Sequence, residues 1–172
     1  MSELIDFTAL SAVLEELAVE VRNTYQDKLI LHDRIASGDL LNSVECEVVV
    51  DDSGYAVTLR LEDYWKYVEE GVQGDRNPNS PYKNPGWKAF PHIMNWIDVK
   101  PVIPRPLDNG KLPTQKQLAY LITRSIKEHG TQGSHDLAEA KGEIIPKYRE
   151  RIAAALGRDM AAYIRKVVAP MQ

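Results

Sequence analysis

The chain has 172 residues, of which 44% are hydrophobic and 27% charged, and its formal net charge is −4. This length and composition are typical of one globular domain, and they exclude a wholly disordered chain, a collagen-like chain and a disulfide scaffold. The single cysteine, Cys46, has no partner for an internal disulfide, and no uncharged run approaches the ~18 residues of a membrane span. We therefore expect a soluble protein made inside the cell.

The charges are distributed unevenly along the sequence. Residues 1–75 carry 17 Asp and Glu against 5 Lys and Arg, whereas residues 76–172 carry 16 Lys and Arg against 8 Asp and Glu. If the two halves lie on opposite sides of the fold, the acidic face of one copy can meet the basic face of the next and build a ring. The alternative is that the two sets of charges mix on the folded surface.

Apolar residues at spacings of 3 and 4 predict one long amphipathic helix from about Ser2 to about Leu31. The apolar positions are Phe7, Leu10, Leu14, Leu17, Val21, Tyr25 and Leu29. This helix is longer than a small core requires. Either its stripe is buried within its own chain, or part of the stripe packs on another subunit.

The segment after this helix predicts a β-hairpin. Apolar and polar residues alternate from Ser43 to Val50, then Asp51-Asp52-Ser53-Gly54 supplies turn chemistry, and alternation resumes from Tyr55. Cys46 lies in the apolar row and is expected to be a small core residue rather than a nucleophile.

The stretch from Asp63 to Gly71 is aromatic and acidic. Tyr64, Tyr67 and Val68 share one helical face, so we expect one turn of helix that packs on the sheet and ends at Gly71. A surface for stacking or carbohydrate binding is the alternative.

A long irregular arm is predicted at about residues 72–113, because eight of the ten prolines lie between Asn77 and Pro113. One short helix inside it starts at Pro91. Residues 99–106 resemble extended polyproline-like chain that can lie along a neighbouring surface.

Two helices follow the arm. Thr114 and Gln117 match a capping box for a helix that runs to Gly130, and a terminal helix is predicted from Ile144 onward, weakened at Gly157. The expected fold is α+β: a long N-terminal helix and C-terminal helices packed on a small antiparallel sheet, in a single domain of residues 1–172 with the proline-rich arm.

The sequence carries no motif that indicates catalysis. The four histidines, His32, His92, His129 and His135, lack metal-site spacing, and no phosphate-binding loop, dinucleotide fingerprint or nucleophile elbow occurs. We expect neither an enzyme nor a cofactor or metal.

Three segments carry a family resemblance. Gly38-Asp39-Leu40-Leu41-Asn42-Ser43 resembles "TGxLxxS", and Tyr64-Trp65-Lys66-Tyr67-Val68-Glu69-Glu70-Gly71 resembles "YAxYVExGT". The segment from Leu118 to Gly133 is similar to "LAxxIARKIxxxGTxG". These patterns, in this order, resemble the neck proteins of tailed bacteriophages, the head-tail joining or tail-completion proteins. The chain departs from them at Ser37 and Val72, where the family has Thr, and its arm is longer.

The resemblance implies a structural virion protein of the head-tail connector or neck, made in the host bacterial cytoplasm. It implies a homo-oligomeric ring of six or twelve copies that contacts portal or connector proteins and tail proteins. Double-stranded DNA would pass through the channel without sequence-specific binding, and no membrane would be involved.

Two groups of residues are candidates for these contacts. The expected inter-subunit or partner contacts are Trp65, Tyr67, Glu69, Trp87, Phe90, Lys100, Pro101 and Arg105. Glu45 and Glu47 are candidates for the channel lining, because an acidic lumen does not retain DNA.

Two other functions remain open from the sequence. The first is a soluble nucleic-acid-binding protein that uses the basic C-terminal half. Its cations would be Lys116, Arg124, Lys127, Arg149, Arg151, Arg158, Arg165 and Lys166. The second is a small enzyme that acts through the Tyr64–Tyr67 stretch and Glu69 or Glu70.

Overall fold

The computed structural model describes residues 7–51, 54–100, 102–108 and 110–168, and it has the predicted α+β fold, with about 61% helix. In chain order the elements are α1 (Thr8–Leu31), α2 (Asp39–Ser43), β1 (Glu45–Asp51), β2 (Gly54–Arg60), α3 (Trp65–Glu70), β3 (Gly71–Val72), the 3₁₀ helix η1 (Gly86–Ala89), α4 (Phe90–Val99), α5 (Gln115–His129), β4 (Thr131–Gln132) and α6 (Asp136–Val168). The predicted helix start at Ser2 lies outside the described residues.

The chain divides into two compact units, each built from segments that are far apart in the sequence. The first unit comprises residues 1–28, 44–61 and 136–172, and the second comprises residues 29–43 and 62–135. The whole of the predicted proline-rich arm, at about residues 72–113, belongs to the second unit. The expectation of a single domain stays a prediction.

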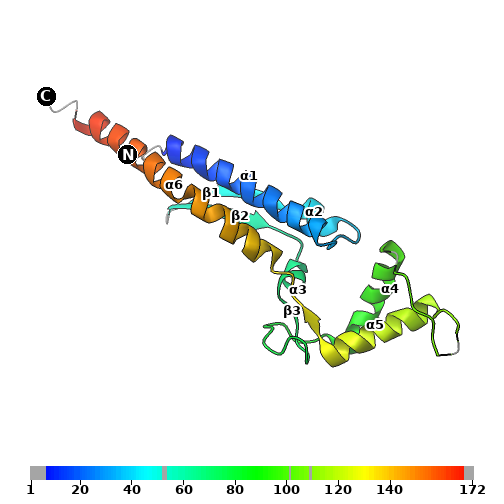
Figure 1. Ribbon diagram of the computed structural model, residues 1–172. Coiled ribbons are helices and arrows are strands. Elements are labelled where there is room, and N and C mark those ends of the chain that lie inside the picture. The colour runs from blue at the N-terminus through cyan, green and yellow to red at the C-terminus, as the bar shows by residue number, and fades with distance from the viewer. Residues whose placement is uncertain (1–6, 52–53, 101, 109, 169–172) are drawn as a thin grey trace. The chain divides into compact units, whose positions relative to one another are not determined.

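In the first unit, α1 and α6 lie side by side and run in opposite directions (Figure 1). Hydrogen bonds and ion pairs join residues whose numbers add to nearly the same total, as antiparallel helices require. The pairs are Leu10 with Asp159, Glu16 with Arg151, Glu20 with Tyr148 and Lys28 with Glu139.

The core of the first unit lies between these two helices and the hairpin. Leu10, Leu14, Leu17 and Val21 of the predicted apolar stripe of α1 are buried in it, and Tyr25 and Leu29 further along the stripe are buried as well. The buried cluster consists of Leu10, Val13, Leu14, Leu17, Val21, Ile144, Tyr148 and Ala155. Val48, Val57 and Leu59 of the hairpin pack against the cluster. This stripe therefore serves its own chain, which is the first of the two alternatives for α1.

The hairpin is confirmed. Strands β1 and β2 pair in antiparallel register, with Cys46 opposite Leu59 and Val48 opposite Val57. Half-burial raises the pKa of the Cys46 thiol, so the thiol is less reactive than an exposed one.

The terminal helix is longer than predicted. α6 begins at Asp136, eight residues before Ile144, and it contains Pro146. Gly142 and Pro146 lower the local helix propensity, which is why the sequence pattern placed the start too late. Burial of Leu137 and Ala140 on the same face as Ile144 outweighs this propensity.

The predicted helices of the second unit are present. α3 ends at Gly71, and Pro91 lies in the first turn of α4. α5 has the predicted capping box: the Gln117 amide donates to the Thr114 hydroxyl over 3.3 Å, and the Thr114 amide donates to the Gln117 side chain over 2.9 Å. Within the described ranges, no helix combines the length and apolar character that crossing a membrane requires.

Candidate interaction surface

Two segments of the second unit that carry the family resemblance meet in space. β3, which follows α3, pairs with β4, which follows α5, so that Gly71 lies opposite Gln132 and Val72 opposite Thr131. Each strand is two residues long, and neither was predicted, because local alternation cannot mark so short a pair. We call this β3–β4 pairing, with its flanking glycines, the glycine junction.

Glycine is required at this junction because the two backbones nearly touch. A Cβ on Gly71 would lie 2.1 Å from the Thr131 carbonyl oxygen, and one on Gly133 would lie 2.0 Å from the Glu69 oxygen. Gly71 and Gly130 also have φ of +67°, in the left-handed region that favours glycine. These glycines are therefore explained by packing rather than by chemistry on a substrate.

Polar side chains tie the beginning of the proline-rich segment to the junction. The Asn77 side-chain amide donates to the carbonyl oxygens of Glu70 and Thr131, over 2.8 and 3.1 Å. The Ser80 hydroxyl donates to the Gly71 carbonyl over 3.0 Å. Because these donors reach backbone acceptors on both sides of the junction, residues 77–80 are part of the folded unit rather than a free arm.

A hydrogen-bonded pair closes the same loop against the end of α5. His129 Nδ1 lies 2.8 Å from an Asp75 carboxylate oxygen, and the Arg76 amide donates to the His129 carbonyl over 3.1 Å. The hydrogen bond to His129 lowers the pKa of Asp75.

An exposed aromatic pair lies on α5 and η1. The rings of Trp87 and Tyr120 stack with centroids 5.0 Å apart, and the Lys127 ammonium lies 5.4 Å from the Trp87 ring centroid. Trp87 is 43% exposed and Tyr120 48% exposed. Exposed tryptophan and tyrosine held in a fixed arrangement are typical of protein interfaces, because they provide large contact area at little entropic cost.

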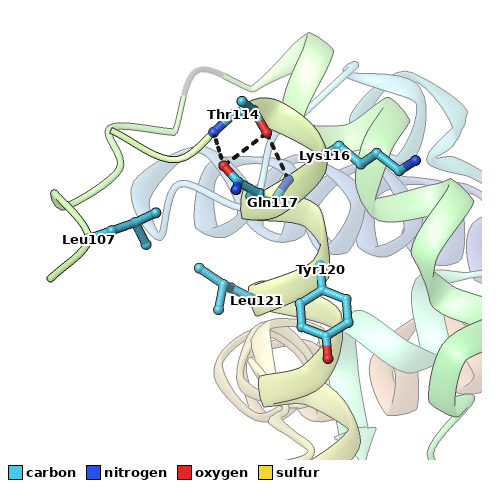
Figure 2. Close-up of a pocket in the computed structure, with 6 residues that line it drawn as sticks. All are labelled: Leu107, Thr114, Lys116, Gln117, Tyr120 and Leu121. Carbon is cyan, nitrogen blue, oxygen red and sulfur yellow. Dashed lines mark hydrogen bonds between the residues drawn. The ribbon is translucent and has the colours of Figure 1, made fainter. Parts of the chain in front are cut away.

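Next to this pair, the chain forms a hollow of about 480 Å³ between the loop before α5 and α5 itself (Figure 2). Figure 2 shows Leu107 on the loop opposite Leu121 on the helix, and the Thr114–Gln117 hydrogen bonds close one end. Lys116 and Tyr120 complete the lining. The hollow is lined mainly by apolar atoms and has one cation at its rim.

A second aromatic and cationic cluster lies on the same unit. The rings of Tyr67 and Tyr82 meet edge to face at 5.1 Å, and the Lys66 ammonium lies 5.5 Å from the Tyr67 centroid. The aromatic stretch around Tyr67 is helical, as predicted, and Tyr67 packs on Tyr82 of the proline-rich segment, whereas packing of this helix on the sheet stays a prediction.

Three of the predicted contact residues have exposed side chains. They are Tyr67, Trp87 and Arg105. All three belong to the second unit, and Trp87 is part of the stacked pair. These positions remain candidates for contact with a partner.

The other predicted contact residues are less accessible. Trp65 and Phe90 are half-buried at the first residues of α3 and α4, and Glu69 is buried at 4% exposure. The Lys100 ammonium lies 2.8 Å from the Asp33 carboxylate, so an internal ion pair already occupies it. Pro101 lies outside the described residues.

The two candidate channel-lining residues lie on β1. Glu45 is exposed, while Glu47 is 2.5 Å from the Arg60 guanidinium on β2. This pairing reduces the negative charge on that face of the hairpin. The channel-lining role of both residues stays a prediction.

Some acidic side chains of the N-terminal half pair with basic or polar side chains of the C-terminal half within the first unit. Glu16 of α1 binds Arg151 of α6, and Glu20 accepts a hydrogen bond of 2.6 Å from Tyr148. That hydrogen bond raises the pKa of the Tyr148 hydroxyl. These pairs support the alternative in which opposite charges mix, and they leave fewer acids free for a neighbouring copy.

The chemistry that this surface presents is that of a contact surface. Across the described ranges, no group of three or more His, Cys, Asp or Glu side chains is arranged to hold a metal ion. The surface instead combines aromatic rings, an apolar hollow and lysines. Tyr120 and Leu121 were not among the predicted contact residues, although Lys116, Tyr120, Arg124 and Lys127 fall on one helical face at spacings of 4, 4 and 3.

Comparison with known proteins adds no identification. No protein-family model, curated protein or solved structure matches this chain.

Proposed function

We propose that the protein is a structural subunit of the neck of a tailed bacteriophage, where copies form a ring around the DNA channel between the head and the tail. The observation that carries this proposal is the glycine junction. Two segments that resemble neck-protein motifs, separated by about sixty residues, pair directly through Gly71 and Thr131–Gln132. The glycines of these segments permit the close backbone contact that the fold requires. Residues kept for folding rather than for chemistry suit a structural protein.

The exposed features of the second unit support the same function. The Trp87–Tyr120 pair and the adjacent hollow offer a contact surface of the kind found in protein interfaces. Residues 77–106, within the predicted arm, contribute several of the expected contacts, including Trp87 and Arg105. A protein whose conspicuous surfaces are for contact fits assembly better than turnover of a substrate.

The proposal is tested by imaging the purified protein by negative-stain electron microscopy and by measuring its mass by light scattering. We expect closed rings with a central opening and one stoichiometry, six or twelve copies. Open filaments or irregular aggregates would contradict the ring. Salt-sensitive binding to a DNA duplex by a protein that forms no ring would instead favour nucleic-acid binding through the basic helices.

A matched substitution sharpens this test. Trp87→Ser combined with Arg105→Glu changes two exposed residues of the predicted contact set, and it leaves Asn77 and Ser80 to bind the junction. We expect the variant to stay folded by circular dichroism and to lose ring formation. Rings that persist in this variant would exclude these two positions from the subunit contact.

A further inference from the structure

Two lysines lie beside the stacked aromatic pair and a third follows Trp87 in the chain, and none of the three has an ion-pair partner among the residues that the structure describes. Lys88 follows Trp87 in η1, Lys116 lines the hollow, and Lys127 lies over the Trp87 ring. By contrast, Arg124 on the same helix face is 2.8 Å from the Glu128 carboxylate. We call Trp87, Lys88, Lys116, Tyr120, Leu121 and Lys127 the lysine–aromatic surface.

The arrangement of the rings favours a protein partner over a single-stranded nucleic acid. Base stacking needs an open ring face, yet the indole of Trp87 is stacked against Tyr120 and is also in contact with the Lys127 ammonium. What remains beside the rings is the apolar hollow between Leu107 and Leu121. A hollow of this kind accepts an aliphatic side chain, and the unpaired lysines at its edge attract carboxylates.

The chain itself carries a helix face with this chemistry on its first unit. On the outer face of α1, by which we mean Ala12, Glu15 and Val19, the side chains line a shallow hollow of about 590 Å³ that extends past Glu16 and Glu20 to Tyr148 of α6. Val19 is 46% exposed, although it lies on a helix that buries most of its other apolar residues. Glu15 has no ion-pair partner within the described part of the chain, and its carboxylate accepts a hydrogen bond of 3.5 Å from the Ser11 hydroxyl.

The spacing on the two helices matches. Lys116 precedes Tyr120 by four residues on α5, and Glu15 precedes Val19 by four residues on α1. Four residues of helix rise about 6 Å, so a Val19 side chain seated against Tyr120 and Leu121 places Glu15 beside Lys116 when the helices run in the same direction. An aliphatic anchor and a charge pair one turn away are typical of helix-in-groove recognition.

We infer that the lysine–aromatic surface of one copy binds the outer face of α1 of a second copy, with Val19 in the hollow and Glu15 paired with Lys116. This contact joins two different surfaces of the same chain, so it is heterologous and can propagate from copy to copy. The inference rests on the proposed ring and deepens it, because it names the two faces that meet.

The test is a charge swap, measured by sedimentation velocity at several protein concentrations. Lys116→Glu and Glu15→Lys each place like charges together, and each is expected to weaken self-association by about tenfold or more. The double variant, Lys116→Glu with Glu15→Lys, restores the pair in reversed order and is expected to recover most of the association. Lys141→Glu, an exposed lysine of α6, is the matched control and should leave association unchanged.

Electron microscopy of the same samples separates this inference from the proposed function. Rings that persist unchanged in Lys116→Glu overturn the inference and leave the neck function standing. If association is lost in the single variants and recovered in the double variant, but the particles are open polymers, the result supports the contact and overturns the closed ring. A wild-type chain that stays monomeric at all concentrations overturns the contact. Val19→Ser removes the apolar anchor without changing the charge, and it should weaken self-association as well. An unchanged association constant in this variant would also contradict the proposed contact.

Discussion

The glycine junction makes a sharp stability prediction, because a single methyl group should break it. In Gly133→Ala the new Cβ would lie 2.0 Å from the Glu69 carbonyl oxygen and 2.7 Å from the Glu70 carbonyl carbon. Both are backbone atoms, so no side chain can turn away to relieve the overlap. Separating the segments also strains the hydrogen bonds from the Ser134 and His135 amides, of 2.9 and 3.1 Å.

The magnitude follows from these contacts. Each backbone hydrogen bond contributes about 0.5–1.5 kcal/mol, and loss of two of them together with weakening of the β3–β4 pairing gives a destabilisation of about 2–4 kcal/mol. For a chain of this size, that lowers the melting temperature by roughly 5–15 °C.

The assay can be directed to the affected unit. All three tryptophans, Trp65, Trp87 and Trp96, lie in the second unit with the junction, so urea unfolding followed by tryptophan fluorescence reports on it. The control is Gly157→Ala in α6, where no atom lies within 4 Å of the added Cβ, and where alanine should stabilise the helix by up to about 1 kcal/mol by circular dichroism. An unchanged fluorescence midpoint in Gly133→Ala would refute the close backbone contact.

Two further predictions concern polar contacts of single side chains. Asp159 accepts hydrogen bonds from the Ala9 and Leu10 amides, over 3.1 and 2.8 Å, and so caps α1 from α6. Asp159→Ala should therefore lower the free energy of unfolding by about 2 kcal/mol, measured by urea unfolding followed by circular dichroism. A variant as stable as the wild type would exclude this cap. The lowered pKa of Asp75 means that its contribution to stability is present above its ordinary pKa and is lost as the pH falls through the folded value. The melting temperature of Asp75→Asn should therefore lie below that of wild type at neutral pH and approach it in acid, and a constant difference would contradict the His129 pairing.

The helices could be predicted from the sequence wherever local chemistry marks their ends. Thr114 and Gln117 form the predicted capping box, and Gly130 ends α5 as expected. The hairpin register also follows from alternation, because only one register buries Val48 and Val57 together. These features depend on residues a few positions apart, which the sequence displays directly.

The junction could not be predicted, because its cause is a contact between distant segments. A two-residue strand carries no alternating pattern, and the need for glycine at position 133 appears only when the Glu69 carbonyl is placed against it. The early start of α6 was missed for a related reason, since burial of Leu137 and Ala140 offsets the poor helix propensity of its first turns.

The uneven charge of the sequence becomes informative only after internal pairing is taken into account. Antiparallel packing places the acidic residues of α1 beside the basic residues of α6, so charges that lie far apart in the chain are paired within one copy. The charges that can serve a partner are those left without an ion pair. Among the described residues, these include Lys116 and Lys127 on α5 and Glu15 on α1. Because surface pairs are screened by salt, a contact built on these residues should weaken as ionic strength rises, whereas the apolar seat of Val19 should not.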